Sequence, residues 1–95
     1  MKSDIPDSVL GAIKEFAVKH GVCKIILFGS RARGTNTARS DIDLAVSGGD
    51  FDGFYHDIHE NADTLLMFDI VQLERISPEL KFEIDRDGIL LYEKA

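Results

Sequence analysis

A chain of 95 residues is long enough for one domain, spanning 1–95, and leaves no room for a second. Its 44% hydrophobic and 29% charged residues are typical of a globular protein and exclude a disordered one. The net charge of −6 argues against broad contact with a nucleic-acid backbone, which needs a basic surface, so we expect no direct nucleic-acid substrate.

The single cysteine and the hydropathy of the chain indicate where the protein works. Cys23 cannot form an internal disulfide, which fits a reducing cytoplasm, and it is predicted to be a small core residue. The chain opens without a charged-then-apolar leader, and no apolar run approaches membrane-spanning length. We therefore expect a soluble, cytoplasmic protein that has no contact with a membrane.

The first predicted element is an amphipathic helix. Asp7 and Ser8 are candidates to cap it, and it runs to about His20, where Gly21 provides a stop signal. Apolar residues recur at helical spacing and predict a buried stripe formed by Val9, Ile13, Phe16 and Ala17.

Two strands and a second helix follow. The branched apolar run at 23–28 (CKIILF) ends at Gly29 and predicts a buried strand. A second strand is predicted at 41–46 (DIDLAV), and Asp50 then caps a helix that extends to about Asp63. The side chains that this helix is expected to bury are Phe51, Phe54, Tyr55 and Ile58.

The last third of the chain predicts a strand, a helix and a final strand. Residues 66–73 (LMFDIVQL) form the third strand, and Ser77 with Pro78 opens a helix that Gly88 closes. Residues 89–92 form the last strand. The pattern has no linker or repeat, so it describes a single-domain α/β (α+β) fold in which helices flank one four-stranded sheet.

The candidate chemistry begins with Asp41 and Asp43. On a strand, side chains at i and i+2 point to the same face, with backbone positions roughly 7 Å apart. Carboxylates that project together repel each other unless a cation lies between them, and Mg²⁺ takes one or two carboxylates plus substrate phosphates. The alternative is the solvated face of an edge strand.

A glycine-containing turn precedes these acids. Gly29 and Ser30 directly follow a buried strand, where glycine lets the backbone approach a ligand and successive N–H groups can hold an anion. Residues 29–40 also carry three arginines and no acid, which favours capture of a small anion. Neither a Walker loop nor a dinucleotide fingerprint is present, and a plain solvated turn is the alternative.

A third carboxylate, Asp69, interrupts the apolar run MFDIV. An acid within a buried strand must be paired, bound to a metal or protonated. The two interpretations that remain open are a metal ligand and a buried partner for an arginine.

These residues carry a family resemblance. The segment GSRARGTNTARSDIDL at 29–44 resembles GSxARGxxxxxSDxDL, the signature of the minimal nucleotidyltransferases of the DNA polymerase β superfamily, at every specified position. Asp69 stands where that superfamily has its third aspartate, and the ending DRDGILLYEK is similar to that of the minimal subgroup.

The resemblance implies a mixed sheet with an ATP-binding edge and two Mg²⁺ ions. Pyrophosphate would leave as the α-phosphorus is attacked in line. Arg31 and Arg33 could also be surface arginines beside acidic neighbours, and Arg39 is assigned a structural role. The implied site residues are Gly29, Ser30, Arg31 and Arg33 for the nucleotide, and Asp41, Asp43 and Asp69 for the metals, with Asp69 helping to deprotonate the attacking hydroxyl.

Minimal nucleotidyltransferases of the MntA-like antitoxin type are often encoded beside a small helical HEPN-domain protein, and in such pairs the HEPN protein is an RNase toxin. The resemblance therefore implies transfer of AMP to a tyrosine hydroxyl of such a partner. One alternative is a small-molecule nucleotidyltransferase completed by a helical substrate-binding partner, and another is an antitoxin that blocks the toxin sterically without catalysis. A homo-oligomer also remains open.

His56 and His59 are expected on a polar helix face because their spacing matches no known zinc site.

Overall fold

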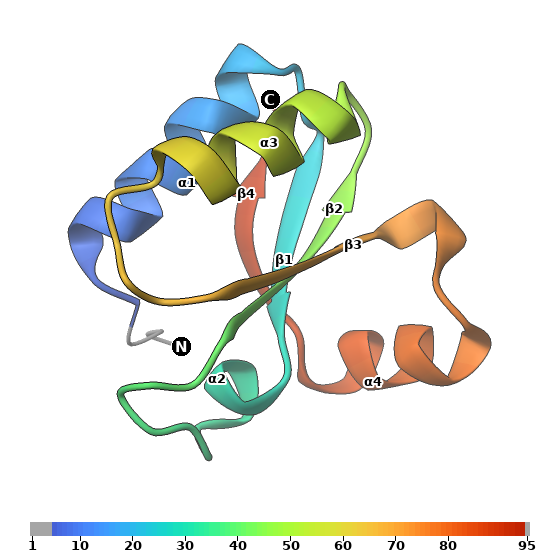
Figure 1. The fold of residues 1–95 in the computed structure, drawn as a ribbon. Helices are drawn as coiled ribbons and strands as arrows, with labels where there is room; N and C mark the ends of the chain where they lie inside the picture. The colour runs from blue at the N-terminus through green and yellow to red at the C-terminus, as the bar shows by residue number, and fades with distance from the viewer. Residues whose placement is uncertain (1–4, 95) are drawn as a thin grey trace.

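The computed structural model describes residues 5–94. The order of elements agrees with the predicted one, except that two short helices were not predicted (Figure 1). The elements are α1 (Asp7–Lys19), β1 (Lys24–Phe28), α2 (Ser30–Arg33), β2 (Ile42–Ser47), α3 (Phe51–Asn61), β3 (Phe68–Gln72), the 3₁₀ helix η1 (Leu73–Arg75), α4 (Pro78–Asp87) and β4 (Ile89–Glu93).

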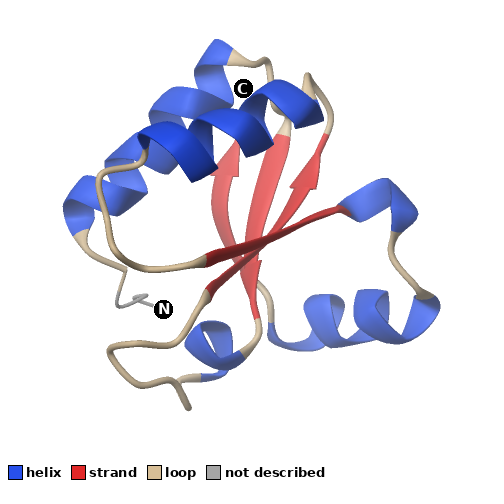
Figure 2. Cartoon of the chain, viewed as in Figure 1, coloured by secondary structure: helices blue, strands red, loops and turns tan. Residues whose placement is uncertain are grey.

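The four strands form one mixed sheet in the order β3-β2-β1-β4 (Figure 2). β1 runs antiparallel to both β2 and β4, whereas β2 and β3 are parallel. A parallel pair needs a crossover connection, which α3 supplies between β2 and β3. The predicted mixed four-stranded sheet with flanking helices is therefore confirmed, and β3 is one of its two edge strands.

The main core lies on one face of the sheet. Figure 1 shows α1 and α3 side by side across this face. Because side chains alternate along a strand, Ile42, Leu44 and Val46 of β2 point into this core and are fully buried. They pack with Ile13 of α1 and Phe54 of α3, both of which have no exposed surface. Burial of this stripe positions β2, so its intervening residues face the opposite side.

The opposite face carries a smaller core. Phe28 of β1, Ala45 of β2 and Ile84 of α4 are its buried members, and α4 packs mainly on β1. Asp43 lies on the same face of β2 as Ala45, two residues before it. The acidic residues of the sheet therefore share a face with α4 and not with α1 and α3.

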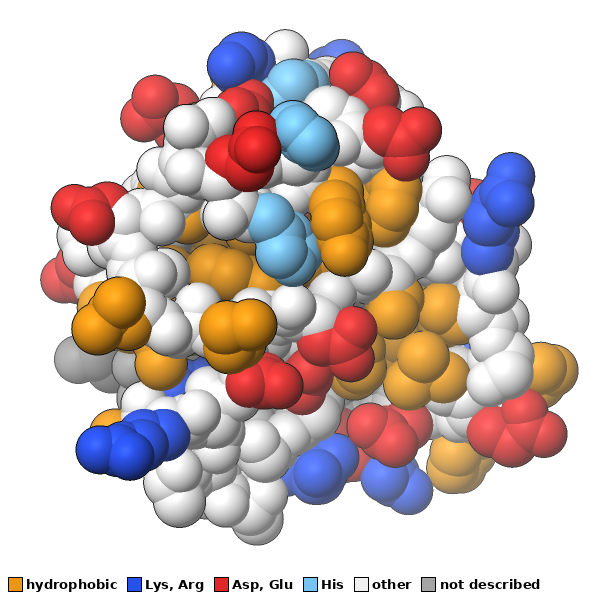
Figure 3. Space-filling model, viewed as in Figure 1, with side chains coloured by type: hydrophobic (Ala, Val, Ile, Leu, Met, Phe, Trp, Pro, Cys, Tyr) orange, Lys and Arg blue, Asp and Glu red, His pale blue; other side chains and the backbone are white. Residues whose placement is uncertain are grey.

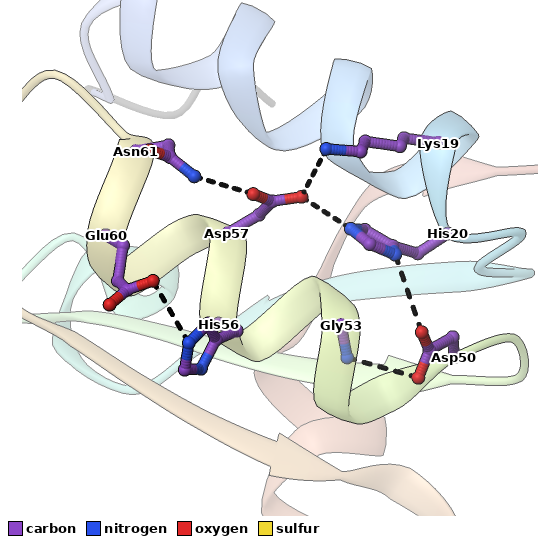
Figure 4. Close-up of polar contacts among 8 residues, drawn as sticks. All are labelled: Lys19, His20, Asp50, Gly53, His56, Asp57, Glu60 and Asn61. Atoms are coloured by element: carbon purple, nitrogen blue, oxygen red, sulfur yellow. Dashed lines mark hydrogen bonds and ion pairs between the residues drawn. The ribbon is translucent and has the colours of Figure 1, made fainter.

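A polar cluster joins α1 to α3 above the sheet (Figure 4). Asp57 accepts a hydrogen bond of 2.6 Å from His20 Nε2 and one of 2.7 Å from Asn61, and it forms an ion pair of 3.0 Å with Lys19. These donors hold the pKa of the Asp57 carboxyl well below its usual range, with His20 the largest cause. On its other side His20 Nδ1 lies 3.6 Å from Asp50, so the cluster links the end of α1 to the start of α3 as well as to Asp57 in its second half.

The predicted helix starts are confirmed for α3 and α4 but not for α1. Asp50 accepts a hydrogen bond from Gly53 N at 3.1 Å, and Ser77 accepts one from Leu80 N at 3.2 Å. The prediction that Asp7 or Ser8 caps α1 is wrong. Pro6 is the N-cap, without a side-chain hydrogen bond, and Asp7 is the first helical residue. An acid in the first turn still favours the helix through its dipole.

Burial also corrects some predictions. Val9, Ile13 and Ala17 are buried in α1 as predicted, whereas Phe16 is only partly buried against the core. Tyr55 is 42% exposed, because it lies on the outer side of α3 and stacks on His59 with ring centroids 4.2 Å apart. Cys23 is exposed, because it precedes β1 at the rim of the sheet.

Within the described residues no helix is both long and apolar enough to span a bilayer.

Candidate functional site

The pairing of β2 with β3 brings the predicted carboxylates together. Asp43 lies directly opposite Asp69 in the parallel register, and paired residues on neighbouring strands point to the same face. Asp41 comes two residues before Asp43, and Ile42 N donates to Met67 O at 2.9 Å, so the ladder begins beside Asp41. The three aspartates predicted from sequence therefore share one face at one end of the sheet.

Gly29 packs against the carboxylate of Asp43. Its φ of 75° and ψ of −156° lie in a region that is essentially restricted to glycine. A Cβ at this position would lie 2.1 Å from Asp43 Oδ2, far inside the 3.0 Å that real contacts respect. The predicted turn thus places the backbone of Gly29 directly against the Asp43 carboxylate, at a distance that leaves no room for a side chain.

Asp43 is the electrostatic centre of the site. The pKa of its carboxyl is raised to about 6, first by burial and then by the negative charges of Asp69, Asp41 and Glu83, while Arg33 opposes the shift. Burial and repulsion both disfavour the ionised form, so this position favours a proton or a cation beside the carboxylate. Asp69 itself is exposed on the edge strand, which overturns its interpretation as a buried partner for an arginine.

The arginines of the turn have separate roles. Arg31 is only 4% exposed and donates from Nε to Ser40 O at 3.0 Å and from Nη2 to Ala38 O at 3.2 Å. Its guanidinium therefore fastens the loop that leads directly into Asp41. Arg33 is exposed and pairs with Glu83 at 3.4 Å. This placement favours an architectural role for Arg31 over the triphosphate contact that the sequence predicted, and leaves Arg33 at the edge of the acidic face.

Two features of this site were not predicted. The four-residue helix α2 holds Ser30 to Arg33, and a segment this short has too little periodicity to be detected. Glu83 comes from α4, 40 residues beyond Asp43 in the sequence, and only the packing of α4 on the sheet brings it near. The helical pattern around Glu83 predicted the element but not its position.

The remaining candidate ligands lie elsewhere. His56 pairs with Glu60 at 3.0 Å and His59 stacks on Tyr55, which confirms the predicted polar face of α3. Among residues 5–94, the His, Cys, Asp and Glu side chains form no group of three that converges as a ready-made metal cluster. Asp41, Asp43 and Asp69 share a face without enclosing a common point.

Comparison with known proteins identifies the family. The model of the family described as "Polymerase beta, Nucleotidyltransferase" matches residues 12–95. No curated protein matches the chain.

Several solved structures have the same fold. A chain of a toxin–antitoxin complex with AMP-PNP is 26% identical at a TM-score of 0.72, with 90% of this chain and 73% of that chain covered. A chain of a mutant MntA–HpeT toxin–antitoxin complex is 25% identical at a TM-score of 0.64, with 84% and 68% covered. A chain of the complex between a tri-AMPylated Shewanella oneidensis HEPN toxin and its MNT antitoxin is 21% identical at 0.65, with 90% and 71% covered, and shows the shared fold alone.

The family model spans all but the first 11 residues, a range that includes the mixed sheet, the turn at Gly29 and the paired aspartates of β2 and β3. This protein belongs to the polymerase β nucleotidyltransferase family.

Proposed function

We propose that this protein is a cytoplasmic, Mg²⁺-dependent nucleotidyltransferase that transfers AMP from ATP to a tyrosine hydroxyl of a HEPN-domain toxin and so neutralises it. The observation that carries the proposal is the pairing of Asp43 with Asp69 beneath the backbone of Gly29. The similarity to a chain of a toxin–antitoxin complex with AMP-PNP supports both the nucleotide and the partner.

The residues present fit Mg²⁺. Carboxylate oxygens are the hard ligands that this ion prefers. The pKa of Asp43 is raised first by burial and then by neighbouring negative charge, which a cation would offset. Magnesium commonly combines one or two carboxylates with substrate phosphates, so the three aspartates need not converge before the nucleotide arrives. Asp41 and Asp43 would hold two ions, and Asp69 would complete the site of the second.

Mg²⁺, when bound, would neutralise phosphate charge and orient the triphosphate for in-line attack. Backbone N–H groups at Gly29 and Ser30, which open α2, would hold the terminal phosphates, and Arg33 at the rim would steady them. Asp69 would accept the proton of the acceptor hydroxyl as its oxygen attacks the α-phosphorus. A new P–O bond forms, the bond from that phosphorus to the bridging oxygen breaks, and pyrophosphate leaves with the electron pair.

The test is AMP transfer to the HEPN-domain protein that the proposal names as partner. Purified partner is incubated with labelled ATP and Mg²⁺, and intact-mass and peptide mass spectrometry locate added AMP. Asp41→Asn and Asp43→Asn should each lower the transfer rate by orders of magnitude, because each removes a charge that positions the nucleotide. Asp52→Asn, an exposed acid on α3, should leave the rate unchanged. Neutralisation of the toxin by wild-type protein without any AMP adduct would refute catalysis.

The same variants separate the two alternatives. A steric antitoxin would neutralise its partner equally well with Asp43→Asn, whereas an enzyme would not. A small-molecule transferase would instead consume ATP with a low-molecular-weight acceptor and leave the mass of the HEPN protein unchanged. We favour protein modification because two solved structures of similar fold, 26% and 25% identical, come from toxin–antitoxin complexes.

A further inference from the structure

A groove of about 650 Å³ opens at the end of the sheet where the aspartates lie. One wall is the loop before β2, and the other is the segment before β3. The lining residues are Pro6, Ala38, Arg39, Thr64, Leu65, Leu66 and Met67.

The groove adjoins the three aspartates. Arg39 is two residues before Asp41, and Met67 is two residues before Asp69. The hydrogen bond from Ile42 N to Met67 O extends the parallel ladder by one step, which sets Met67 beside Asp41. Positions two residues apart along an extended chain are separated by about 7 Å. A partner side chain that packs on Met67 would therefore lie one or two residues, along the partner's own chain, from a hydroxyl held at Asp69.

Two apolar side chains of this groove face solvent to an unusual degree. Leu65 is 101% exposed and Met67 is 65% exposed, although Leu66, which lies between them in the sequence, packs against the main core. Figure 3 shows hydrophobic side chains at the surface next to acidic ones along β3. Apolar groups gathered beside a polar site mark a surface that another molecule covers, whereas scattered ones do not.

The groove also contains Arg39, the arginine of residues 29–40 whose side chain makes no ion pair or hydrogen bond with the rest of residues 5–94. Arg31 is occupied with the carbonyls of Ala38 and Ser40, and Arg33 with Glu83. Arg39 is exposed, and within residues 5–94 its guanidinium has no ion-pair partner. In a chain of net charge −6, this positive side chain gives a carboxylate of another molecule a pairing position in the groove.

We propose that this groove docks the polypeptide segment of the partner protein that carries the acceptor hydroxyl. An apolar or aromatic side chain of that segment packs on Leu65 and Met67, and an acidic one pairs with Arg39. The inference rests on the proposed function, because it assigns the acceptor side of the same site. A nucleotide is a poor occupant, since the walls are apolar and offer a single positive side chain. Exposed thioether and leucine surfaces suit aromatic and aliphatic side chains of a protein.

The test separates docking from chemistry. Affinity of the HEPN partner for this chain is measured by calorimetry without ATP, and steady-state AMP transfer is measured in parallel. Leu65→Glu, Met67→Glu and Arg39→Glu should each weaken partner binding at least tenfold and raise the KM for the partner. The affinity for ATP, measured without partner, should stay within twofold. Because these side chains are exposed, the thermal unfolding of each variant should match that of the wild type.

Val18→Glu is the matched control. Val18 is 67% exposed, which is close to Met67, but it lies near the far end of α1, roughly 18 Å along the helix from the groove. Its substitution should change neither partner affinity nor KM. Unchanged partner affinity in all three groove variants would overturn the docking inference and leave the proposed function intact. Groove-dependent binding without AMP transfer would support docking and overturn the enzymatic proposal instead.

Discussion

Replacing Gly29 by alanine tests how the turn and the acidic face depend on each other. The substitution adds a single methyl group, but it does so at φ 75° and ψ −156°, a conformation that L side chains rarely adopt. The new Cβ would also meet Asp43 Oδ2 at 2.1 Å. Backbone strain and displacement of a proposed metal ligand are therefore introduced together.

The two effects have different magnitudes. Holding a non-glycine residue in this region costs about 1–3 kcal/mol, which lowers the melting temperature of a domain this size by about 4–8 °C per kcal/mol. The carboxylate must also move by about 0.9 Å to reach even a 3.0 Å contact. Because a 1 Å misplacement in a catalytic site can cost roughly 100-fold in rate, we expect AMP transfer to fall by about that factor.

Two further glycines separate strain from contact. Gly34 has φ 78° but nothing within 4 Å of an added methyl group, so Gly34→Ala should lower stability while the chemical step stays near wild-type rate. Gly11 lies in the middle of α1 with open space around it, so Gly11→Ala should raise the free energy of unfolding of the protein by about 1 kcal/mol. Thermal unfolding and transfer kinetics are measured on all three variants. Gly29→Ala with wild-type stability and rate would refute the reasoning.

Four other substitutions probe the surrounding interactions. Asp57→Asn should lower the free energy of unfolding at pH 7. Ionised Asp57 stabilises the fold above its unfolded-state pKa of 3.8, and this stabilisation is lost as the pH falls through the lower folded-state pKa. Urea titrations of wild type and variant should therefore converge at acid pH. Asp43→Asn should raise thermal stability at pH 7 in EDTA, because burial and the neighbouring acids disfavour its charge, while transfer is abolished; a less stable variant would contradict this. Arg31→Lys should lower stability by about 1–3 kcal/mol, since an ammonium cannot reproduce the forked contact with two carbonyls, whereas Arg33→Lys at an exposed pair should change it by less than about 1 kcal/mol.

Most elements of the fold could be predicted because their signals are local. The capping side chains of Asp50 and Ser77 mark helix starts that the structure confirms. The start of α1 was predicted wrongly because proline also begins helices, and Tyr55 was predicted to be buried because an amphipathic pattern does not fix the width of the buried stripe. The strand ends moved by one or two residues.

The residues of the candidate site also fall into those that local sequence patterns predict and those that they do not. The spacing of Asp41 and Asp43 and the glycine-serine turn are contiguous motifs, so their residue types alone indicate magnesium and phosphate. The burial of Arg31 and the approach of Glu83 to Asp43 were not predictable, because each depends on a contact between distant segments.

By itself, the sequence of this protein determined which segments form the four strands and the three longer helices, and which residues carry oxygen ligands, since both follow from short-range patterns. Only the tertiary structure decided that Asp43 pairs with Asp69, that Gly29 lies against that carboxylate, and that Leu65, Met67 and Arg39 share one groove. The physical reason is that strand register follows from burying Ile42, Leu44 and Val46 against two helices. Because packing of the whole core sets this register, it also places the polar residues of the opposite face.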